Sequence, residues 1–378
     1  MVVHNAYGAM AGGGRGHVGG VERQTSMTAR WLAAQGYAVS ILTWDEGQPD
    51  REVIDGVQVV KMCREDEGLP ILRFFHPRAS SLFAAMDRAD ADVYYHNCAE
   101  HYTGLVAWWC RKNRRKFVYS VAHDYGCSPR NPMLSRPHER FLYRYGLKAA
   151  DRIIVQTESQ RKMMREGFGL DSVVLPMPCR GPEGHEGEHG VLRNAEPVIW
   201  VGRAAPIKRM EWLFRIAELC PQTRFQVAAG NANTSYSTTL CEATKAFPNV
   251  EWLGSVPRDR MAGLYQRASA LCCTSVNEGF PNTFLEAWSW GCPVVTSFDP
   301  DGIVARDGLG ITCHSVEDFA AAIRGLRQEP EKWAAMSRAG EKYFRKNHAL
   351  NVAMDRFERE FVSVCRRTVL SSELVSIR

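Results

Sequence analysis

The chain has 378 residues, of which 45% are hydrophobic and 24% are charged, and its formal net charge is +5 at pH 7. This length predicts two domains, and the composition excludes a disordered chain, a collagen and a coiled coil. The sequence contains no run of roughly 18 uncharged apolar residues, the length of a membrane span, and the mild charge gives no indication of nucleic acid as a partner.

The N-terminus and the cysteines indicate where the protein resides. The first three residues form only a short apolar stretch before a glycine-rich segment, which is not the pattern of a secretory signal peptide. The twelve cysteines are scattered and never form a CxxC pair. Both features predict a reducing compartment, so we expect a cytoplasmic protein.

Strands and helices alternate through the first half of the chain. A short strand at 2–4 and a glycine-rich loop over 8–20 precede a helix expected over 22–36. Apolar runs predict further strands at 38–43, 57–61, 93–96, 117–121 and 152–156, with helices at 80–88 and 102–112. This alternation predicts a parallel sheet covered by helices on both faces.

A segment rich in proline and glycine interrupts the pattern between 176 and 197 and predicts a linker. The alternation restarts with a helix at 210–219, a run of helices from 316, and strands at 198–201, 224–229, 250–253, 270–274 and 294–296. The expected fold class is therefore α/β, with two doubly wound domains whose ligands bind beyond the carboxyl ends of the strands. The expected boundaries are an N-terminal domain over 1–178, a linker over 179–197, a C-terminal domain over 198–352, and a helical tail over 353–378 that returns to the N-terminal domain.

Two motifs resemble metal-binding signatures but are interpreted otherwise. His185 and His189 with Glu186 spell HExxH, yet three glycines within seven residues would cost roughly 3 kcal/mol of helix propensity relative to alanine. Asp90 and Asp92 spell DxD, but they precede a strand, whereas ligands gather at the other end of parallel strands. We therefore interpret the first as linker and the second as solvated loop charges.

The most informative segment follows the fourth expected strand of the second half. Pro281 and Asn282 are typical of a helix start, with Asn282 as the expected N-cap, and Gly291 ends the helix. Glu278 then lies in the loop before the helix, and Glu286 lies one turn inside it. The N-terminus of such a helix binds phosphate, and a carboxylate one turn in can accept hydrogen bonds from a ribose diol.

A second strand–loop–helix segment contains Gly202, Arg203 and Lys208. Gly202 permits close approach of a ligand to the backbone, and the two cations would converge on one anionic group. With a helix dipole they would form a clamp for a diphosphate that requires no metal. Two exposed basic residues in a loop are the alternative interpretation.

These two segments together carry a family resemblance. Glu278 and Glu286 in the context EGFPN…LEA…GCPVV, with Gly202, Arg203 and Lys208, resemble the retaining family 4 glycosyltransferases of the GT-B fold, of the bacterial polysaccharide and glycoconjugate type. The segments GGVE at 19–22 and ADRIIVQTES at 150–159 extend the resemblance over nearly the whole chain. It implies two Rossmann-like domains facing across a cleft, with the acceptor on the N-terminal side and the nucleotide-sugar on the C-terminal side.

The resemblance also implies roles for individual residues. Glu286 would bind the ribose hydroxyls, Glu278 the donor sugar, and Arg203 with Lys208 the diphosphate. His123 matches the family's cleft histidine, and with Arg203, Lys208 and Glu278 it makes up the expected catalytic set. The other donor-binding residues that the resemblance implies are Gly19, Gly20, Gly202, Gly279, Phe280, Pro281, Asn282 and Thr283.

The implied reaction moves a hexosyl-type sugar from a UDP-sugar or GDP-sugar to a hydroxyl of a saccharide or lipid-linked saccharide. It would retain the anomeric configuration, require no metal or other cofactor, and serve cell-surface polysaccharide or glycoconjugate biosynthesis. A nucleotide-sugar epimerase on the same fold and a non-catalytic nucleotide-sugar-binding partner subunit are the alternatives.

A basic cluster beside two tryptophans predicts contact with an anionic membrane surface, at about 1 kcal/mol for each well-placed cation. Its members are Arg111, Lys112, Arg114, Arg115 and Lys116. It adds the expectation of a peripheral position on the inner face of the membrane, and a solvated helix end is the alternative.

Overall fold

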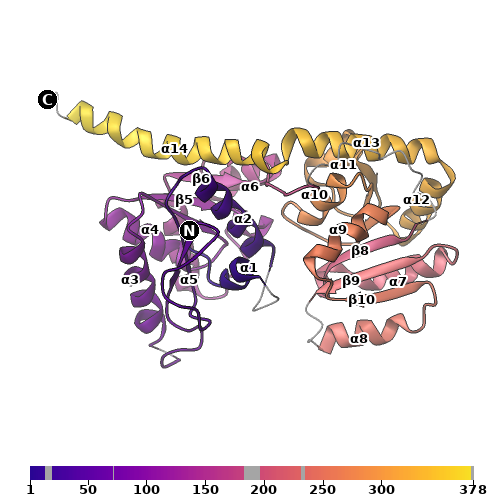
Figure 1. Cartoon of the computed structure of the whole chain (residues 1–378), viewed down its shortest axis with the longest axis horizontal. Coiled ribbons are helices and arrows are strands. Elements are labelled where there is room, and N and C mark those ends of the chain that lie inside the picture. The colour runs from indigo at the N-terminus through magenta and orange to yellow at the C-terminus, as the bar shows by residue number, and fades with distance from the viewer. Residues whose placement is uncertain (13–18, 71, 183–195, 231–234, 376–378) are drawn as a thin grey trace. The chain divides into compact units, whose positions relative to one another are not determined.

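A computed structural model describes residues 1–12, 19–70, 72–182, 196–230 and 235–375 (Figure 1). The chain divides into two compact units, each of which is described by itself. Unit 1 comprises residues 1–178 and 353–378, and unit 2 comprises residues 179–352. The HExxH motif at 185–189 lies outside the described residues, as do most of the expected linker and positions 13–18 of the glycine-rich segment.

Unit 1 contains a mostly parallel sheet. Val2 forms parallel bridges to Leu42 on one side and to His96 on the other, so the start of the chain lies between two sets of strands. One set is β1 (Val39–Thr43), β3 (Val57–Lys61) and the antiparallel edge strand β2 (Glu52–Ile54). The other set is β4 (Val93–Asn97), β5 (Lys116–Ser120), β6 (Arg152–Val155) and β7 (Val173–Val174).

The helices of unit 1 mostly follow the strands, as a parallel sheet requires. They are α1 (Tyr7–Ala11), α2 (Gly20–Ala34), α3 (Ser80–Ala89), α4 (Tyr102–Lys112), α5 (Pro137–Ala149) and α6 (Glu158–Phe168), with the short helical turns η1 (Phe74–Ala79) and η2 (Asp124–Cys127). The last helix, α14 (Leu350–Val375), belongs to this unit from Ala353 onward. Arg152 of β6 forms an ion pair with Glu360 of α14 at 2.9 Å, and Phe357 is buried.

Unit 2 has a six-stranded sheet whose paired strands are all parallel. Its spatial order is β10 (Val250–Gly254), β9 (Phe225–Gly230), β8 (Val198–Arg203), β11 (Ala270–Cys273), β12 (Val294–Thr296) and β13 (Gly310–Thr312). Its helices are α7 (Met210–Leu219), α8 (Ser235–Thr244), α9 (Arg258–Arg267), α10 (Asn282–Ser289), α11 (Ile303–Arg306), α12 (Val316–Gln328) and α13 (Pro330–Asn347), with the turns η3 (Pro206–Lys208) and η4 (Pro300–Gly302). α7 packs against α12, and α10 packs against α13.

The structure confirms the α/β class and most of the expected elements, and it corrects two of them. The expected strand at 2–4 is reduced to an isolated bridge residue, Val2, and His4 already lies in a turn. The segment expected to be a glycine-rich loop from residue 8 begins with the helix α1, because Tyr7 and Met10 are buried. Within the described ranges, no helix combines the length and the apolar character needed to cross a membrane.

Helices α4 and α5 approach each other so closely that glycine is required between them. A Cβ atom added to Gly146 of α5 would lie 2.6 Å from the carbonyl oxygen of Thr103 on α4. Real Cβ atoms do not tolerate that distance, so a side chain at 146 would force the two helices apart.

We expect Gly146→Ala to lower the free energy of unfolding by about 1 to 3 kcal/mol, as overpacking typically does. Gly325→Ala in the middle of α12 is the matched control, because there an added Cβ would approach nothing closer than 3.5 Å, and alanine favours the helix by about 0.8–1.0 kcal/mol. Urea denaturation measures both variants. Equal stability of Gly146→Ala and wild type would show that α4 and α5 are not packed through their backbones.

Candidate functional site

The strand order of unit 2 reverses between β8 and β11. β9 and β10 extend the sheet beyond β8, whereas β12 and β13 extend it beyond β11. In an open parallel sheet, ligands bind at the carboxyl ends of the two strands between which the order reverses. The loops 204–209 and 274–281, which follow these two strands, therefore form the candidate site of unit 2.

An ion pair between Lys208 and Glu278 joins the two loops. Lys208 is the last residue of η3 after β8, and Glu278 lies between β11 and α10. Their side chains are 21% and 14% exposed, so the pair is largely shielded from solvent. An ammonium group carries three N–H donors, so Lys208 can bind an anion while it remains paired with Glu278.

Arg209 connects three loops of unit 2 through hydrogen bonds: its own loop, the loop after β11 and the loop after β12. It has a left-handed backbone, with φ 45° and ψ 53°, immediately before α7. Its Nε donates to the carbonyl oxygen of Thr274 and its Nη2 to Ser297 Oγ, each at 2.9 Å. Its guanidinium also lies 3.8 Å from the ring centroid of Trp212. Because these contacts join residues 65 and 88 positions apart, no local pattern in the sequence assigned Arg209 a role.

Thr274 supports the same arrangement from within. Its Oγ1 donates to the carbonyl oxygen of Lys208 at 2.5 Å and accepts from Trp200 Nε1 at 3.1 Å. The backbone N–H of Val276 donates to the carbonyl oxygen of Ile207 at 2.9 Å. The two loops therefore share backbone and side-chain hydrogen bonds in addition to the ion pair.

Glu286 is held by a tyrosine that the sequence analysis did not single out. Tyr265 on α9 donates a hydrogen bond from its hydroxyl to Glu286 Oε2 at 2.8 Å. Tyr265 is 1% exposed, and burial raises its pKa, so the hydroxyl keeps its proton. The contact orients one carboxylate oxygen of Glu286 and leaves Oε1 as a further acceptor.

The start of α10 differs by one residue from the expectation. The helix begins at Asn282, and Pro281, with φ −66° and ψ 118°, occupies the N-cap position without a side-chain hydrogen bond. The expectation that Asn282 is the N-cap is wrong because helical geometry already includes it. Among the described residues, the N-cap position contributes no side-chain hydrogen bond to α10 and its first turn contains no acidic residue, so neither neutralises the positive end of its dipole.

The other predicted residues of unit 2 lie around the same loops. Gly202 and Arg203 are the last two residues of β8, and Arg203 is exposed. Arg203 and Lys208 are both cations, at the end of β8 and in the turn after it, and their convergence on one anion stays a prediction. Gly279 is buried and Thr283 is half-buried. The ring of Phe280 packs 5.0 Å from that of His348.

The predicted residues of unit 1 lie at the carboxyl end of β5 and at the start of α2. His123 follows β5, and its Nδ1 accepts a hydrogen bond from the backbone N–H of Tyr125 at 3.2 Å. This places the imidazole proton on Nε2 in the neutral tautomer. Gly19 occupies the N-cap position of α2, and Gly20 is its first residue.

The DxD motif is a structural ion-pair site. Asp90 and Asp92 lie 2.5 and 3.5 Å from the guanidinium of Arg115, and their side chains are 75% and 91% exposed. Lys116 likewise pairs with Asp151 at 2.8 Å. Two of the five cations of the basic cluster are therefore matched by carboxylates. In the part of the chain that the structure describes, no three His, Cys, Asp or Glu side chains are grouped to hold a metal ion.

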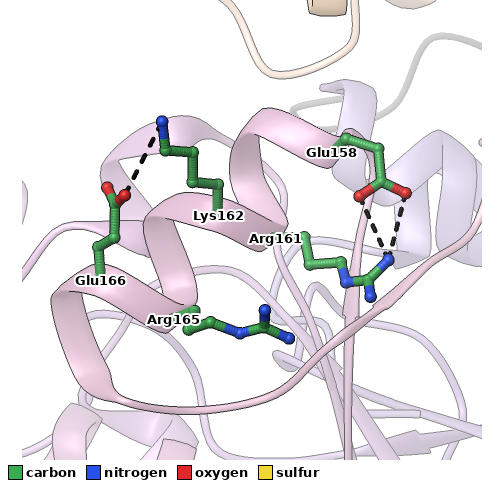
Figure 2. A pocket seen from close by; sticks show the side chains of 5 residues that line it. All are labelled: Glu158, Arg161, Lys162, Arg165 and Glu166. Carbon is green, nitrogen blue, oxygen red and sulfur yellow. Dashed lines mark hydrogen bonds and ion pairs between the residues drawn. The ribbon is translucent and has the colours of Figure 1, made fainter.

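A shallow polar pocket lies on the surface of α6 (Figure 2). Glu158 pairs with Arg161 at 3.3 Å and Lys162 with Glu166 at 3.9 Å (Figure 2). Arg165 pairs with Asp171 at 2.9 Å. The charges are exposed and balance one another, and no predicted site residue lines the pocket. We therefore interpret it as a solvated helix face.

Comparison with known proteins identifies relatives of both halves of the chain. A family model described as "Glycosyl transferase 4-like domain" matches residues 19–180, and one described as "Glycosyl transferases group 1" matches residues 195–329. The D-inositol 3-phosphate glycosyltransferase of Mycobacterium avium (strain 104) is 28% identical over 379 residues, which cover 90% of this chain and 87% of that protein.

Two solved structures share the fold. Sucrose-phosphate synthase from Thermosynechococcus elongatus has a TM-score of 0.75 and 16% identity, with 94% of each chain covered. An alpha,alpha-trehalose-phosphate synthase from Burkholderia xenovorans, in complex with glucose-6-phosphate, has a TM-score of 0.69 and 15% identity, with 95% of this chain and 99% of that chain covered. At these identities the likeness concerns the fold alone.

We expect Arg209→Lys to destabilise the protein, because an ammonium cannot make both hydrogen bonds and the contact with Trp212 at once. The expected loss in free energy of unfolding is about 1.5 to 3 kcal/mol, the range for hydrogen bonds to a charged group. Arg215→Lys, on the exposed face of α7, is the control and should leave urea denaturation unchanged. If both variants have the same free energy of unfolding as wild type, the contacts of Arg209 do not stabilise the loops.

Proposed function

This chain belongs to the family 4 glycosyltransferases and has the GT-B fold, and from that premise we propose that it transfers a hexosyl-type sugar from a nucleoside diphosphate sugar to an acceptor hydroxyl with retention of configuration. The observation that carries the proposal is the pairing of Lys208 with Glu278 where the strand order of unit 2 reverses. Lys208 supplies a cation for the diphosphate, and Glu278 supplies an acceptor for the sugar hydroxyls.

The chemistry of the leaving group explains why these groups are needed. Breaking the anomeric bond develops negative charge on the diphosphate. Lys208, Arg203 and the uncapped start of α10 would stabilise this charge more strongly in the transition state than in the ground state. These protein charges are sufficient for the transfer without a divalent ion in this proposal. Glu286, oriented by Tyr265, would bind the ribose of the nucleotide.

The acceptor that we propose is a polyhydroxyl compound. The sequence resemblance implies a saccharide or lipid-linked saccharide, whereas the names of the relatives include inositol 3-phosphate and glucose-6-phosphate. All of these offer ring hydroxyls to the donor. Both classes of compound therefore belong in the first acceptor panel. The role that we propose in the cell is polysaccharide biosynthesis.

A donor panel tests the proposal most directly. UDP-glucose, UDP-N-acetylglucosamine and GDP-mannose would each be supplied with the acceptor panel in buffer containing EDTA. Release of nucleoside diphosphate that depends on the acceptor supports it, and NMR of the product determines the anomeric configuration. Release of an epimerised sugar without any acceptor would identify an epimerase instead.

Lys208→Ala is expected to slow transfer by about 10²- to 10³-fold, the usual effect of removing one donor to a developing anion. The fold should survive, because Thr274 and Arg209 continue to join the loops. Lys245→Ala removes an exposed ion-paired lysine in the turn after α8 and should retain full activity. Wild-type turnover of Lys208→Ala would remove this lysine from the mechanism.

Tyr265→Phe is expected to weaken binding of the nucleoside diphosphate about 5- to 10-fold, since one hydrogen bond contributes roughly 1 kcal/mol. Calorimetric titration with UDP and GDP measures the effect. Tyr236→Phe is the matched control, because Tyr236 also donates to a glutamate, Glu211, at 2.5 Å on the exposed surface. An equal Kd in all three proteins would show that Glu286 does not need its tyrosine.

A further inference from the structure

Unit 1 has a reversal of strand order of its own. From the position of Val2, the sheet continues through β1 and β3 on one side and through β4 to β7 on the other. The rule that locates the site of unit 2 therefore points to the residues after Val2 and after β4. These are His4 and the segment 98–101, to which the sequence analysis assigned no function.

His4 and Glu100 are in contact at this point. His4 Nδ1 lies 3.2 Å from Glu100 Oε2. The imidazole lies between aromatic rings, 4.6 Å from Trp44 in a stacked arrangement and 4.1 Å from Tyr102. The His4 side chain is 10% exposed, whereas that of Glu100 is 41% exposed. The largely buried imidazole of His4 thus contacts the carboxylate of Glu100, which remains accessible to solvent.

The surroundings keep this carboxylate ionised. Partial burial by itself would raise the pKa of Glu100, but the hydrogen bond with His4 and the nearby His96 and His101 lower it to about 2. His4 lies in the turn after Val2, His96 on β4 and His101 at the start of α4. The thiol of Cys98 and the hydroxyl of Tyr102 are further titratable groups that interact with Glu100. Glu100 is therefore a pure hydrogen-bond acceptor near neutral pH.

The backbone two residues before Glu100 is strained. Cys98 has φ 133°, in the left-handed region that favours glycine. Its carbonyl oxygen accepts from the backbone N–H of Glu100 and from Thr103 Oγ1, each at 3.2 Å. Such strain persists where surrounding contacts impose it, and it clusters at binding and catalytic sites.

Buried imidazole nitrogens at the same place lack partners. His96 donates from Nδ1 to the carbonyl oxygen of Val2 at 2.9 Å and is 1% exposed. Among the described residues, His96 Nε2 and His4 Nε2 have no hydrogen-bond partner. Buried polar atoms without partners are uncommon in folded proteins and require an explanation. Here they coincide with the strained turn and the ionised carboxylate.

Aromatic rings continue from His4, the partner of Glu100, through Tyr102, which packs against it. The ring of His101 lies 4.2 Å from that of Tyr102 and 5.4 Å from that of Phe74, and both His101 and Phe74 are half-buried. A single ionised acceptor beside apolar ring surfaces suits a polyhydroxylated ring, which offers O–H donors and C–H faces.

We infer that Glu100 is the hydroxyl-binding carboxylate of an acceptor site on unit 1, that its ligand is a polyhydroxylated ring such as a saccharide or cyclitol, and that His4 positions Glu100. The inference rests on the proposed glycosyl transfer. Glu100 would accept hydrogen bonds from one or two ring hydroxyls and thereby determine which hydroxyl receives the sugar.

Steady-state kinetics of Glu100→Gln tests the inference. The amide keeps the shape but loses the charge, so the acceptor KM should rise about 10- to 100-fold, the range for losing charge-assisted hydrogen bonds. The probes are glucose, glucose-6-phosphate, myo-inositol and inositol 3-phosphate. Slow donor hydrolysis without acceptor should not change. Glu166→Gln, an exposed ion-paired carboxylate on α6, is the control and should keep the wild-type acceptor KM.

His4→Phe tests the positioning role through pH. With His4 absent, burial is no longer opposed by the histidine, so the pKa of Glu100 should rise. The acceptor KM of His4→Phe should then increase as the pH falls from 7 to 5, whereas that of wild type should stay constant. A merely structural histidine would not produce this profile.

The outcomes separate this inference from the proposed function. Wild type that is stabilised by UDP or GDP and hydrolyses a donor, but has an acceptor KM unaffected by Glu100→Gln, overturns the inference alone. The same result follows if wild type with working donor hydrolysis neither binds nor glycosylates any compound of the panel. Absence of nucleotide stabilisation and donor turnover in wild type overturns the proposed function itself.

Discussion

One topological constraint determines where side chains can form a site in this protein. In each unit the order of parallel strands reverses once, and the two loops that follow the strands at the reversal must diverge to opposite faces of the sheet. In unit 2 the loops are brought together again by Lys208, Glu278 and Arg209. Together with the hydrogen bonds of Thr274 and Val276, these contacts fix the start of α10 relative to the cation after β8.

Three carboxylates at these positions are each held by a different kind of partner. Glu278 contacts an ammonium, Glu286 a buried tyrosine hydroxyl, and Glu100 an imidazole. The partner determines what each carboxylate can do. Lys208 partly neutralises the charge of Glu278, and the neutral hydroxyl of Tyr265 fixes the orientation of the Glu286 carboxylate. His4 keeps the Glu100 carboxylate ionised although it is partly buried. The same functional group is thereby adapted to three different demands.

The sequence predicted what depends on local patterns. The strand at 270–274 and the helix expected between Asn282 and Gly291 correspond closely to β11 and α10. A continuous apolar run defines the strand, and a proline and a glycine with φ 60° delimit the helix. The antiparallel edge strand β2 and the strand β13, which has three residues, were not predicted. Partners such as Tyr265 and His4 escaped detection since their contacts are set by the packing of distant segments.

The placement of the last helix has a consequence for biosynthesis. Unit 1 consists of two segments of chain separated by the whole of unit 2, and Phe357 and Glu360 of α14 complete its packing. The ribosome delivers these residues only after it has synthesised the whole of unit 2. Nascent unit 1 therefore cannot complete its packing until α14 is synthesised, and the surface that α14 covers stays exposed until then. All strands of unit 2 are synthesised before α14. We therefore expect chaperones to bind the N-terminal part of the chain during synthesis.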